Sequence, residues 1–280
     1  MAVQQATGVD LAAYLDRIGY DGDLAPTLDT LAAIHRAHVG AIPFENLDVA
    51  LEREIRLDPP GLEAKLVRSR RGGYCFEHGS LLAAALIDLG FAVTRHAARV
   101  RDGSDAVRPR SHMCLSVVVD EQRWLVDTGF GGDGLLWPLR FGSEATQGSW
   151  GFRLVPDDRG EAWRLQTRDA GRWRDLYAFG DEPHHPVDFE VFNHYTATGP
   201  RSPFRGRVVA QRAGEHERRR LVDTTFTITG PDGVVAERQV EPDALAAVLD
   251  EHFGIAVSAD EAARLAAVAV ASAARRQEGS

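Results

Sequence analysis

The pattern of apolar residues changes at Phe91, and this change constrains the fold more than any other feature of the chain. Before it, apolar residues recur at helical spacing between N-capping residues and glycines, as from Asp10 to Gly19 and from Thr27 to Gly40. After it, short apolar runs are separated by Gly, Asp and Pro, which is typical of the strands of a barrel or sandwich. The sequence therefore predicts an α+β protein whose helices precede its strands.

Further elements follow from the same patterns. A helix that begins at Ser258 has Glu261 three residues later, which forms a capping box. Three other helices are expected at about residues 62–69, 75–90 and 243–253. Strands are expected at about residues 91–100, 112–120, 122–130, 152–157, 162–169, 172–179, 206–212, 219–228 and 233–239. The length allows one large domain or two to three smaller ones.

Composition and charge exclude several classes of protein. With 280 residues, 44% of them hydrophobic, the chain can bury a core without disulfides, and its two cysteines stand at unrelated positions. This favours a reducing compartment, and we expect a cytoplasmic protein. The first residues lack the features of a signal peptide and no apolar run is long enough to span a bilayer, so no membrane association is expected. A net charge of −9 argues against nucleic acid as a partner.

Basic residues nevertheless gather just before Cys75, at Arg68, Arg70 and Arg71, and in a later stretch from Arg201 to Arg220. Arg201 to Arg207 lie among Pro, Ser and Gly, where a loop that binds a small polyanion is expected. Arg218 to Arg220 have two interpretations, a similar binding site or a solvated charged face.

Cys75 is the candidate nucleophile. It follows an Arg-Gly-Gly turn and precedes the helix expected up to Gly90, which places it at a helix N-terminus. There, unpaired backbone N–H groups and the positive end of the helix dipole favour the thiolate, the form of cysteine that attacks electrophiles. The alternative is a small buried apolar residue, which is what most free cysteines are. Cys114 lies inside an apolar run.

A nucleophilic cysteine needs a base, and the base needs a partner that orients it. His112 begins one apolar strand and Asp127 ends the next. If these strands form a hairpin whose two-residue turn is Glu121 and Gln122, Asp127 faces Ser116 and lies roughly 13 Å along the strand from His112. This register puts both side chains on one face of the sheet without contact, so a bulge or bend would be needed to join them.

Other polar residues near Cys75 are expected to have lesser roles. His78 lies three residues into the helix and points away from its tip, as a surface residue or a support for the site. Glu77, in the first turn, is expected to satisfy N–H groups and to complement the helix dipole. Neither cysteine has a C-x-x-C partner, so no metal site is expected.

Five segments resemble, in order and spacing, the arylamine N-acetyltransferase family, and the resemblance covers nearly the whole chain. They are I-P-F-E-N-L-D-V at 42–49, R-G-G-Y-C-F-E-H at 71–78, R-S-H-M-C-L-S-V at 110–117, W-L-V-D-T-G-F-G-G at 124–132 and F-N-H-Y-T-A-T-G-P-R-S-P-F at 192–204.

The resemblance implies a papain-like arrangement with a catalytic triad of Cys75, His112 and Asp127. It also implies three domains, at residues 1–90, 91–204 and 205–280. The first, which is helical, would supply the cysteine. The second, a β-barrel, would supply the histidine and the aspartate, and the third would form an α/β lid. The contact between His112 and Asp127 is thus implied by the family and not by the hairpin register.

The resemblance also implies a two-step reaction. Acetyl-CoA, the expected co-substrate, would acetylate Cys75, and the thioester would pass its acetyl group to an arylamine, arylhydrazine or hydrazide while His112 moves the proton. Phe44, Phe130 and Phe204 match positions that line the substrate pocket, the alternative for Phe44 being plain core packing. No metal or tightly bound cofactor is expected, and we expect a monomer or dimer.

Three residues are expected to contact the coenzyme: Gly131, Gly132 and Phe204. The glycines have no side chain that would keep backbone N–H groups away from phosphates.

Two positions depart from the family pattern. Gly79 stands where Asn is usual, and Ala197 where Ser is common. They leave open an amide synthase that releases or cyclises a polyketide chain from an acyl carrier protein with the same triad. Two further interpretations are a papain-like hydrolase, with water as the acceptor, and a binding protein whose triad is inactive.

Overall fold

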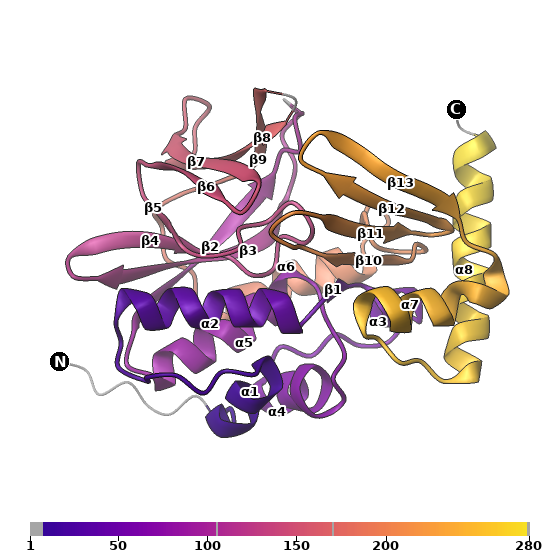
Figure 1. Cartoon of the computed structure of the whole chain (residues 1–280), viewed down its shortest axis with the longest axis horizontal. Helices are drawn as coiled ribbons and strands as arrows, with labels where there is room; N and C mark the ends of the chain where they lie inside the picture. The colour runs from indigo at the N-terminus through magenta and orange to yellow at the C-terminus, as the bar shows by residue number, and fades with distance from the viewer. Residues whose placement is uncertain (1–7, 105, 170, 279–280) are drawn as a thin grey trace.

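The computed structural model describes residues 8–104, 106–169 and 171–278. Two antiparallel sheets lie side by side in Figure 1. Helices α2 (Leu28–Ala41) and α5 (Cys75–Asp88) lie below the first sheet, and α8 (Ala259–Glu278) lies at the outer side of the second. This α+β architecture confirms the predicted fold class. Across the described residues, no helix has both the length and the apolar composition that a bilayer crossing requires.

The N-terminal helices begin and end where the capping residues predict. Asp10 accepts a hydrogen bond from the Ala13 N–H and Thr27 from the Thr30 N–H, and Gly19 ends the first helix with a left-handed φ of 68°. The helices in this part are α1 (Leu11–Ile18), α2 (Leu28–Ala41), α3 (Leu47–Ala50), α4 (Pro59–Leu62) and α5 (Cys75–Asp88). The helix predicted at 62–69 starts earlier, because α4 continues directly into a π-helical segment at Glu63–Arg68.

The larger sheet has eight strands in the order β5-β4-β3-β2-β9-β8-β7-β6. Its end strands β5 and β6 come close to each other, so the sheet nearly closes into a barrel. The strands are β2 (Ala92–Val100), β3 (Arg110–Val119), β4 (Gln122–Val126), β5 (Leu139–Arg140), β6 (Glu144–Gln147), β7 (Trp150–Pro156), β8 (Trp163–Asp169) and β9 (Arg172–Phe179). β5 and β6 are short and were not predicted.

The register predicted for the β3–β4 hairpin was wrong. Val119 pairs with Gln122, so the two-residue turn is Asp120 and Glu121, not Glu121 and Gln122. Asp120 and Glu121 have φ values of 49° and 61°, the left-handed conformation that a type I′ turn requires. The sequence has no glycine or asparagine that would mark this turn. The predicted register was therefore off by two residues.

The smaller sheet joins distant parts of the chain in the order β1-β10-β11-β12-β13. The strand predicted at 219–228 is in fact a hairpin of two strands, since the chain turns at Asp223, whose φ is 55°. The strands are β1 (Phe44–Glu45), β10 (Val209–Arg212), β11 (Arg218–Val222), β12 (Thr225–Gly230) and β13 (Gly233–Gln239).

Three more helices complete the fold. α6 (Pro186–Thr198), which was not predicted, packs on α5 and β3. α7 (Leu245–Phe253) follows a 3-10 turn at Pro242–Ala244 and ends at Gly254, and α8 (Ala259–Glu278) starts at the predicted capping box, where the Ser258 N–H donates to Glu261 Oε2 over 2.8 Å.

Three apolar cores hold these layers together. The largest surrounds α5 and includes the side chains on the inner face of β3. A second fills the nearly closed barrel, and a third lies between the smaller sheet and the helices α3, α7 and α8. α5 thus lies where the helical layer meets the barrel, and its N-terminus carries Cys75.

Candidate active site

Cys75 is the first residue of α5, as the sequence predicts. The side chain of Glu77 accepts the N–H of Tyr74 over 3.0 Å, which caps the start of the helix. Cys75 is 3% exposed, and its Sγ lies 3.4 Å from the carbonyl oxygen of Ser111. The cysteine therefore faces the strand that carries the candidate base.

The structure joins His112 and Asp127. His112 Nε2 lies 2.8 Å from Asp127 Oδ2, and both residues are buried. When the observed hairpin register is continued, Asp127 falls opposite Cys114, only two residues from His112 on the same face. At strand rise this is roughly 7 Å, which two side chains can bridge. The bend that seemed necessary from the sequence is not needed, because the turn lies elsewhere.

The charge state of His112 follows from its neighbours. Burial acts against the charged imidazole, but the Asp127 carboxylate, followed by the Cys75 side chain, outweighs it and raises the pKa of His112 to about 10. Burial likewise opposes ionisation of Asp127, but His112 and the Gly129 N–H hold the pKa of this carboxyl below its usual value. Since Nε2 of His112 is occupied by Asp127, Nδ1 is the nitrogen left for the Cys75 thiol.

Tyr177 on β9 packs under this pair. Its ring centroid lies 4.7 Å from that of His112, and the tyrosine is completely buried. The Cys114 thiol points into the barrel core, and burial raises its pKa well above the usual value. Of the two cysteines, only Cys75 lines the cleft described next.

A cleft of about 1030 Å³ opens above Cys75 and His112. Its walls include the three phenylalanines that were predicted for the pocket: Phe44, Phe130 and Phe204. The Phe130 ring meets the His112 ring edge-on at 5.2 Å, and Phe44 lies 5.9 Å from Phe204 between ring centroids. Aromatic side chains thus surround the space in front of the thiol.

The glycines predicted to contact the coenzyme are placed differently from each other. Gly132 lines the cleft, but its N–H already donates to the Gln211 side chain over 2.7 Å. Gly131 has a φ of 93° and is not part of the lining, and a Cβ there would meet Gln211 Oε1 at 2.2 Å. Gly131 therefore lets Gln211 approach this loop, and Gly132 gives it a hydrogen bond.

Arginines dominate the charge of the cleft. Of the arginines in the predicted 201–207 loop only Arg201 lines the cleft, whereas Arg218, Arg219 and Arg220 all do. Arg218 stacks over the Trp150 ring at 3.6 Å and donates to Asp133 over 2.9 Å. The charged lining residues are seven arginines and three aspartates: Arg108, Arg168, Arg174, Arg201, Arg218, Arg219, Arg220, Asp102, Asp133 and Asp169. The cleft is therefore basic within an acidic protein.

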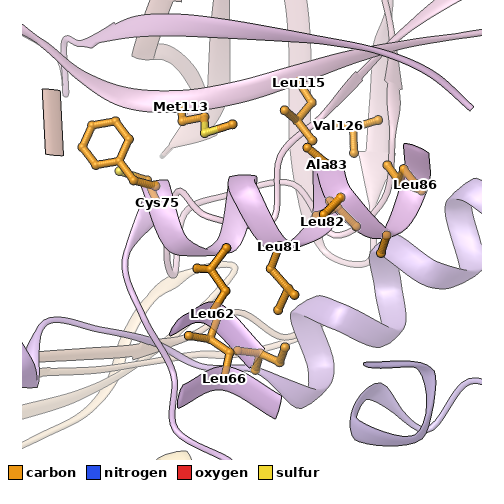
Figure 2. Packing of buried hydrophobic residues seen from close by; sticks show 14 of the residues in the cluster. Leu62, Leu66, Cys75, Leu81, Leu82, Ala83, Leu86, Met113, Leu115 and Val126 are labelled. Carbon is orange, nitrogen blue, oxygen red and sulfur yellow. The ribbon is translucent and has the colours of Figure 1, made fainter. Parts of the chain in front are cut away.

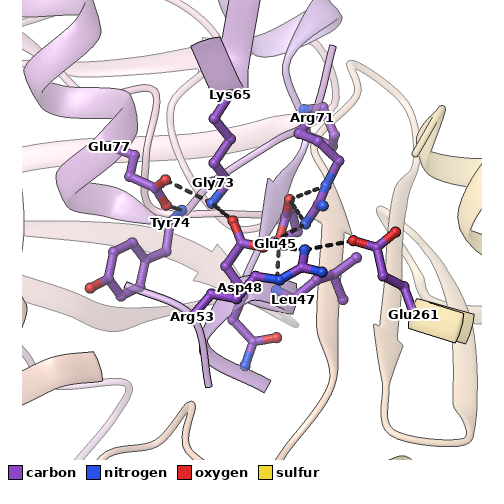
Figure 3. Close-up of polar contacts among 12 residues, drawn as sticks. Glu45, Leu47, Asp48, Arg53, Lys65, Arg71, Gly73, Tyr74, Glu77 and Glu261 are labelled. Atoms are coloured by element: carbon purple, nitrogen blue, oxygen red, sulfur yellow. Dashed lines mark hydrogen bonds and ion pairs between the residues drawn. The ribbon is translucent and has the colours of Figure 1, made fainter. Parts of the chain in front are cut away.

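A network of charged side chains lies behind the start of α5 (Figure 3). Lys65, the only lysine of the chain, contacts Glu77 over 2.7 Å and Asp48 over 2.8 Å. Burial raises the pKa of Glu77 to about 7 even though Lys65 opposes this shift. Arg71 contacts Glu45 over 2.8 Å. The residues flanking Cys75 are thus held from behind by ion pairs.

The face of α5 that looks toward β3 carries Gly79, one turn after Cys75. Figure 2 shows Met113 lying over this helix. A Cβ on Gly79 would meet Cγ and Sδ of Met113 at 2.9 Å. Gly79, which departs from the family pattern, therefore leaves the space that the Met113 side chain occupies.

Sequence reasoning missed the histidines that support the site. No role was assigned to His35 and His38, and His78 was expected as a surface residue or a support. All three are completely buried. The only sequence signal was that two of them lie three residues apart on a mostly apolar helix. Among the described residues, no group of three or more His, Cys, Asp or Glu side chains is arranged to hold a metal ion.

Comparison with known proteins identifies the family. Residues 27–262 match the family model described as N-acetyltransferase. The arylamine N-acetyltransferase of Escherichia coli is 38% identical over 250 residues, which cover 87% of this chain and 88% of that protein.

Solved structures support the same family assignment. The arylamine N-acetyltransferase of Mycobacterium abscessus has a TM-score of 0.90 at 35% identity, with 95% of this chain and 97% of that one covered. That of Mycobacterium marinum in complex with CoA has a TM-score of 0.85 at 35% identity, with 93% and 98% covered. The sequence resemblance is thereby confirmed: this chain is an acyltransferase that belongs to the arylamine N-acetyltransferase family.

Proposed function

We propose that this enzyme moves an acetyl group from acetyl-CoA to Cys75 and then to an arylamine, arylhydrazine or hydrazide. The observation that carries the proposal is the contact between His112 and Asp127 beside Cys75, with Cys75 and His112 both lining the aromatic cleft. The 2.8 Å contact between His112 and Asp127 holds the imidazole in one orientation, with its other nitrogen toward the thiol.

With its raised pKa, His112 holds at Nδ1 the proton of the Cys75 thiol, so the pair enters the first half-reaction as a thiolate and an imidazolium. The thiolate attacks the thioester carbonyl, a new C–S bond forms, and the bond to the coenzyme sulfur breaks. The leaving coenzyme thiolate then takes the proton from His112. The free energy changes little because one thioester replaces another, so this step needs a good nucleophile and correct placement.

In the second half-reaction, the nitrogen of a neutral aromatic amine attacks the acetyl carbon. The C–N bond forms, the C–S bond to Cys75 breaks, and the amine proton passes through His112 to the departing thiolate. Phe44, Phe130 and Phe204 provide apolar surface against which an aromatic ring can pack beside the thioester.

The basic cleft supports a polyanionic donor. Seven arginines against three aspartates give the lining an excess of four positive charges, in a chain whose net charge is −9. Coenzyme A carries a diphosphate and a further phosphate, which arginine binds well. The relative from Mycobacterium marinum was solved as a CoA complex. Gly132 can give its N–H to a phosphate once Gln211 releases it.

Intact mass spectrometry after mixing with acetyl-CoA tests the proposal. One added acetyl group is expected on the wild-type chain and on Cys114→Ala, and none on Cys75→Ala. Failure of the wild-type chain to gain an acetyl group would overturn the proposal. If acyl groups were accepted only from a carrier protein, the amide synthase alternative would replace it.

A further inference from the structure

Two histidines on α2 reach opposite halves of the candidate site. His35 and His38 lie three residues apart, both completely buried and neither in the lining of the cleft. His35 contacts the backbone of Asp127, and His38 contacts His78 on the helix that begins with Cys75. One helix is therefore attached both to the acid and to the support of the nucleophile.

The hydrogen-bond chain that contains His38 has only one possible direction. His78 Nε2 lies 3.1 Å from Gly73 O and 3.2 Å from Pro43 O, and because carbonyl oxygens only accept, this nitrogen carries the proton. Nδ1 of the neutral His78 ring then accepts from His38 Nε2 over 2.9 Å. His38 Nδ1 in turn accepts from the Tyr14 hydroxyl over 2.9 Å.

Both rings of this chain are neutral. Burial lowers the pKa of His78 to about 4 and that of His38 well below its usual value. A neutral ring donates from one nitrogen and accepts at the other, so every nitrogen in the chain has a partner. Loss of any member would leave a buried polar atom unsatisfied.

The hydrogen-bond chain ends at the turn that precedes Cys75. Gly73 O, which accepts from His78, also accepts the Glu45 N–H over 2.8 Å. The His78 ring stacks on Phe44, a wall of the cleft, at 6.5 Å between centroids and 11° between planes. His78 therefore ties together the turn before the nucleophile and the strand beside it.

His35 fixes the other half of the site. Its Nδ1 donates to Leu136 O over 3.1 Å, so its Nε2 is the acceptor, and it receives the Asp127 N–H over 3.1 Å. Burial lowers the pKa of His35 to about 4, which keeps the ring neutral. The backbone of Asp127 is thereby held from α2, while its carboxylate holds His112.

We propose that α2 sets the distance between Cys75 and the His112–Asp127 pair, with His35 and His38 as positioning residues. The inference rests on the proposed function, since it assumes that the thiol and the imidazole act together. Neither residue touches the reacting atoms. Their effect is geometric, and a misplacement of about 1 Å at a reacting centre can cost roughly 100-fold in rate.

The test measures how fast iodoacetamide alkylates Cys75, read from the peptide that carries it, at a temperature where every variant is folded. His38→Gln keeps a donor long enough to reach His78, whereas the shorter His38→Asn does not. We expect alkylation to slow roughly 10- to 100-fold in His38→Asn and to stay within about 3-fold of wild type in His38→Gln. His35→Leu is expected to match His38→Asn.

His96→Leu is the matched control. His96 is also completely buried and also hydrogen-bonded, to Ser116 Oγ over 2.8 Å, but within the barrel. Its loss is expected to lower the melting temperature without changing the alkylation rate. In the acetyl-transfer reaction, the α2 variants should have a lower kcat than the wild type and a nearly unchanged KM.

The possible outcomes separate the two proposals. Equal alkylation rates in His38→Gln, His38→Asn and wild type would overturn the positioning role, whatever the melting temperatures are. An equally large loss in His96→Leu would overturn it as well. If wild-type Cys75 reacts no faster than a free thiol, the proposed function itself fails. Should His35→Leu not fold, the His38 pair still decides.

Discussion

Gly79→Ala is expected to destabilise this protein, although glycine is a poor helix former. In an open helix the change to alanine is worth about 1 kcal/mol of stabilisation. Here the new Cβ would lie 2.9 Å from Cγ and Sδ of Met113, whose side chain is 1% exposed. Overpacking of this kind costs about 1–3 kcal/mol. The two effects sum to a net loss of about 0–2 kcal/mol.

Two further variants isolate the cause. Gly40→Ala lies in α2 with no atom within 4 Å of its Cβ, so it should stabilise by up to about 1 kcal/mol. In a Met113→Ala background the obstacle to Gly79→Ala is gone, and the same substitution should then stabilise by about 1 kcal/mol. Urea unfolding of the four Gly79 and Met113 combinations measures this coupling, expected at about 1–3 kcal/mol. If Gly79→Ala stabilised the protein as much as Gly40→Ala does, the packing argument would be refuted.

Three other predictions test the site and its supports. Asp127→Asn should lower acetyl transfer by roughly two to four orders of magnitude while the fold persists, which steady-state kinetics and circular dichroism would show. Lys65→Met removes the partner of the buried Glu77 and should cost about 3–5 kcal/mol in urea unfolding, with Glu77→Gln in the same chain recovering part of it. The folded pKa of His35 and His78, about 4, lies below the unfolded value of 6.5, so the unfolded chain binds more protons between these values. The stability that depends on these two rings should therefore be complete above about pH 6.5 and fall toward pH 4, whereas the raised pKa values of His112 and Glu77 act in the opposite direction. Thermal unfolding of the wild type and of His35→Leu across this range measures the histidine contribution as a difference.

Local signals predicted much of the fold. Capping residues such as Asp10 and Thr27 and the glycine at the end of α1 fixed the first helices to within a residue, because these interactions are short in sequence. The turn of the β3–β4 hairpin was misplaced because Asp120 and Glu121 adopt left-handed φ values without the usual glycine. Only the pairing of the whole strands determines that register.

The candidate site was predicted only in part, because local features can be read from the sequence and contacts between distant residues cannot. Cys75 could be recognised from its own surroundings, since a helix start is a local feature. The partnership of His112 and Asp127 depended on a register that the residues did not reveal, and it came from the family resemblance. The supports His35 and His38 act across distances of many residues, so nothing near them in the sequence marked their role. The domain boundaries, the oligomeric state and the cytoplasmic location stay predictions.

The most direct test of Cys75 as the acetyl carrier is a single turnover in two separate steps. The enzyme is mixed with acetyl-CoA, freed of coenzyme, and then given an aromatic amine, while the Cys75 peptide and the amide product are quantified together. We predict that the acetyl group leaves Cys75 at the rate at which an equal amount of N-acetylated amine appears. Product that forms only while acetyl-CoA is present, with no acetyl group ever found on Cys75, would contradict it.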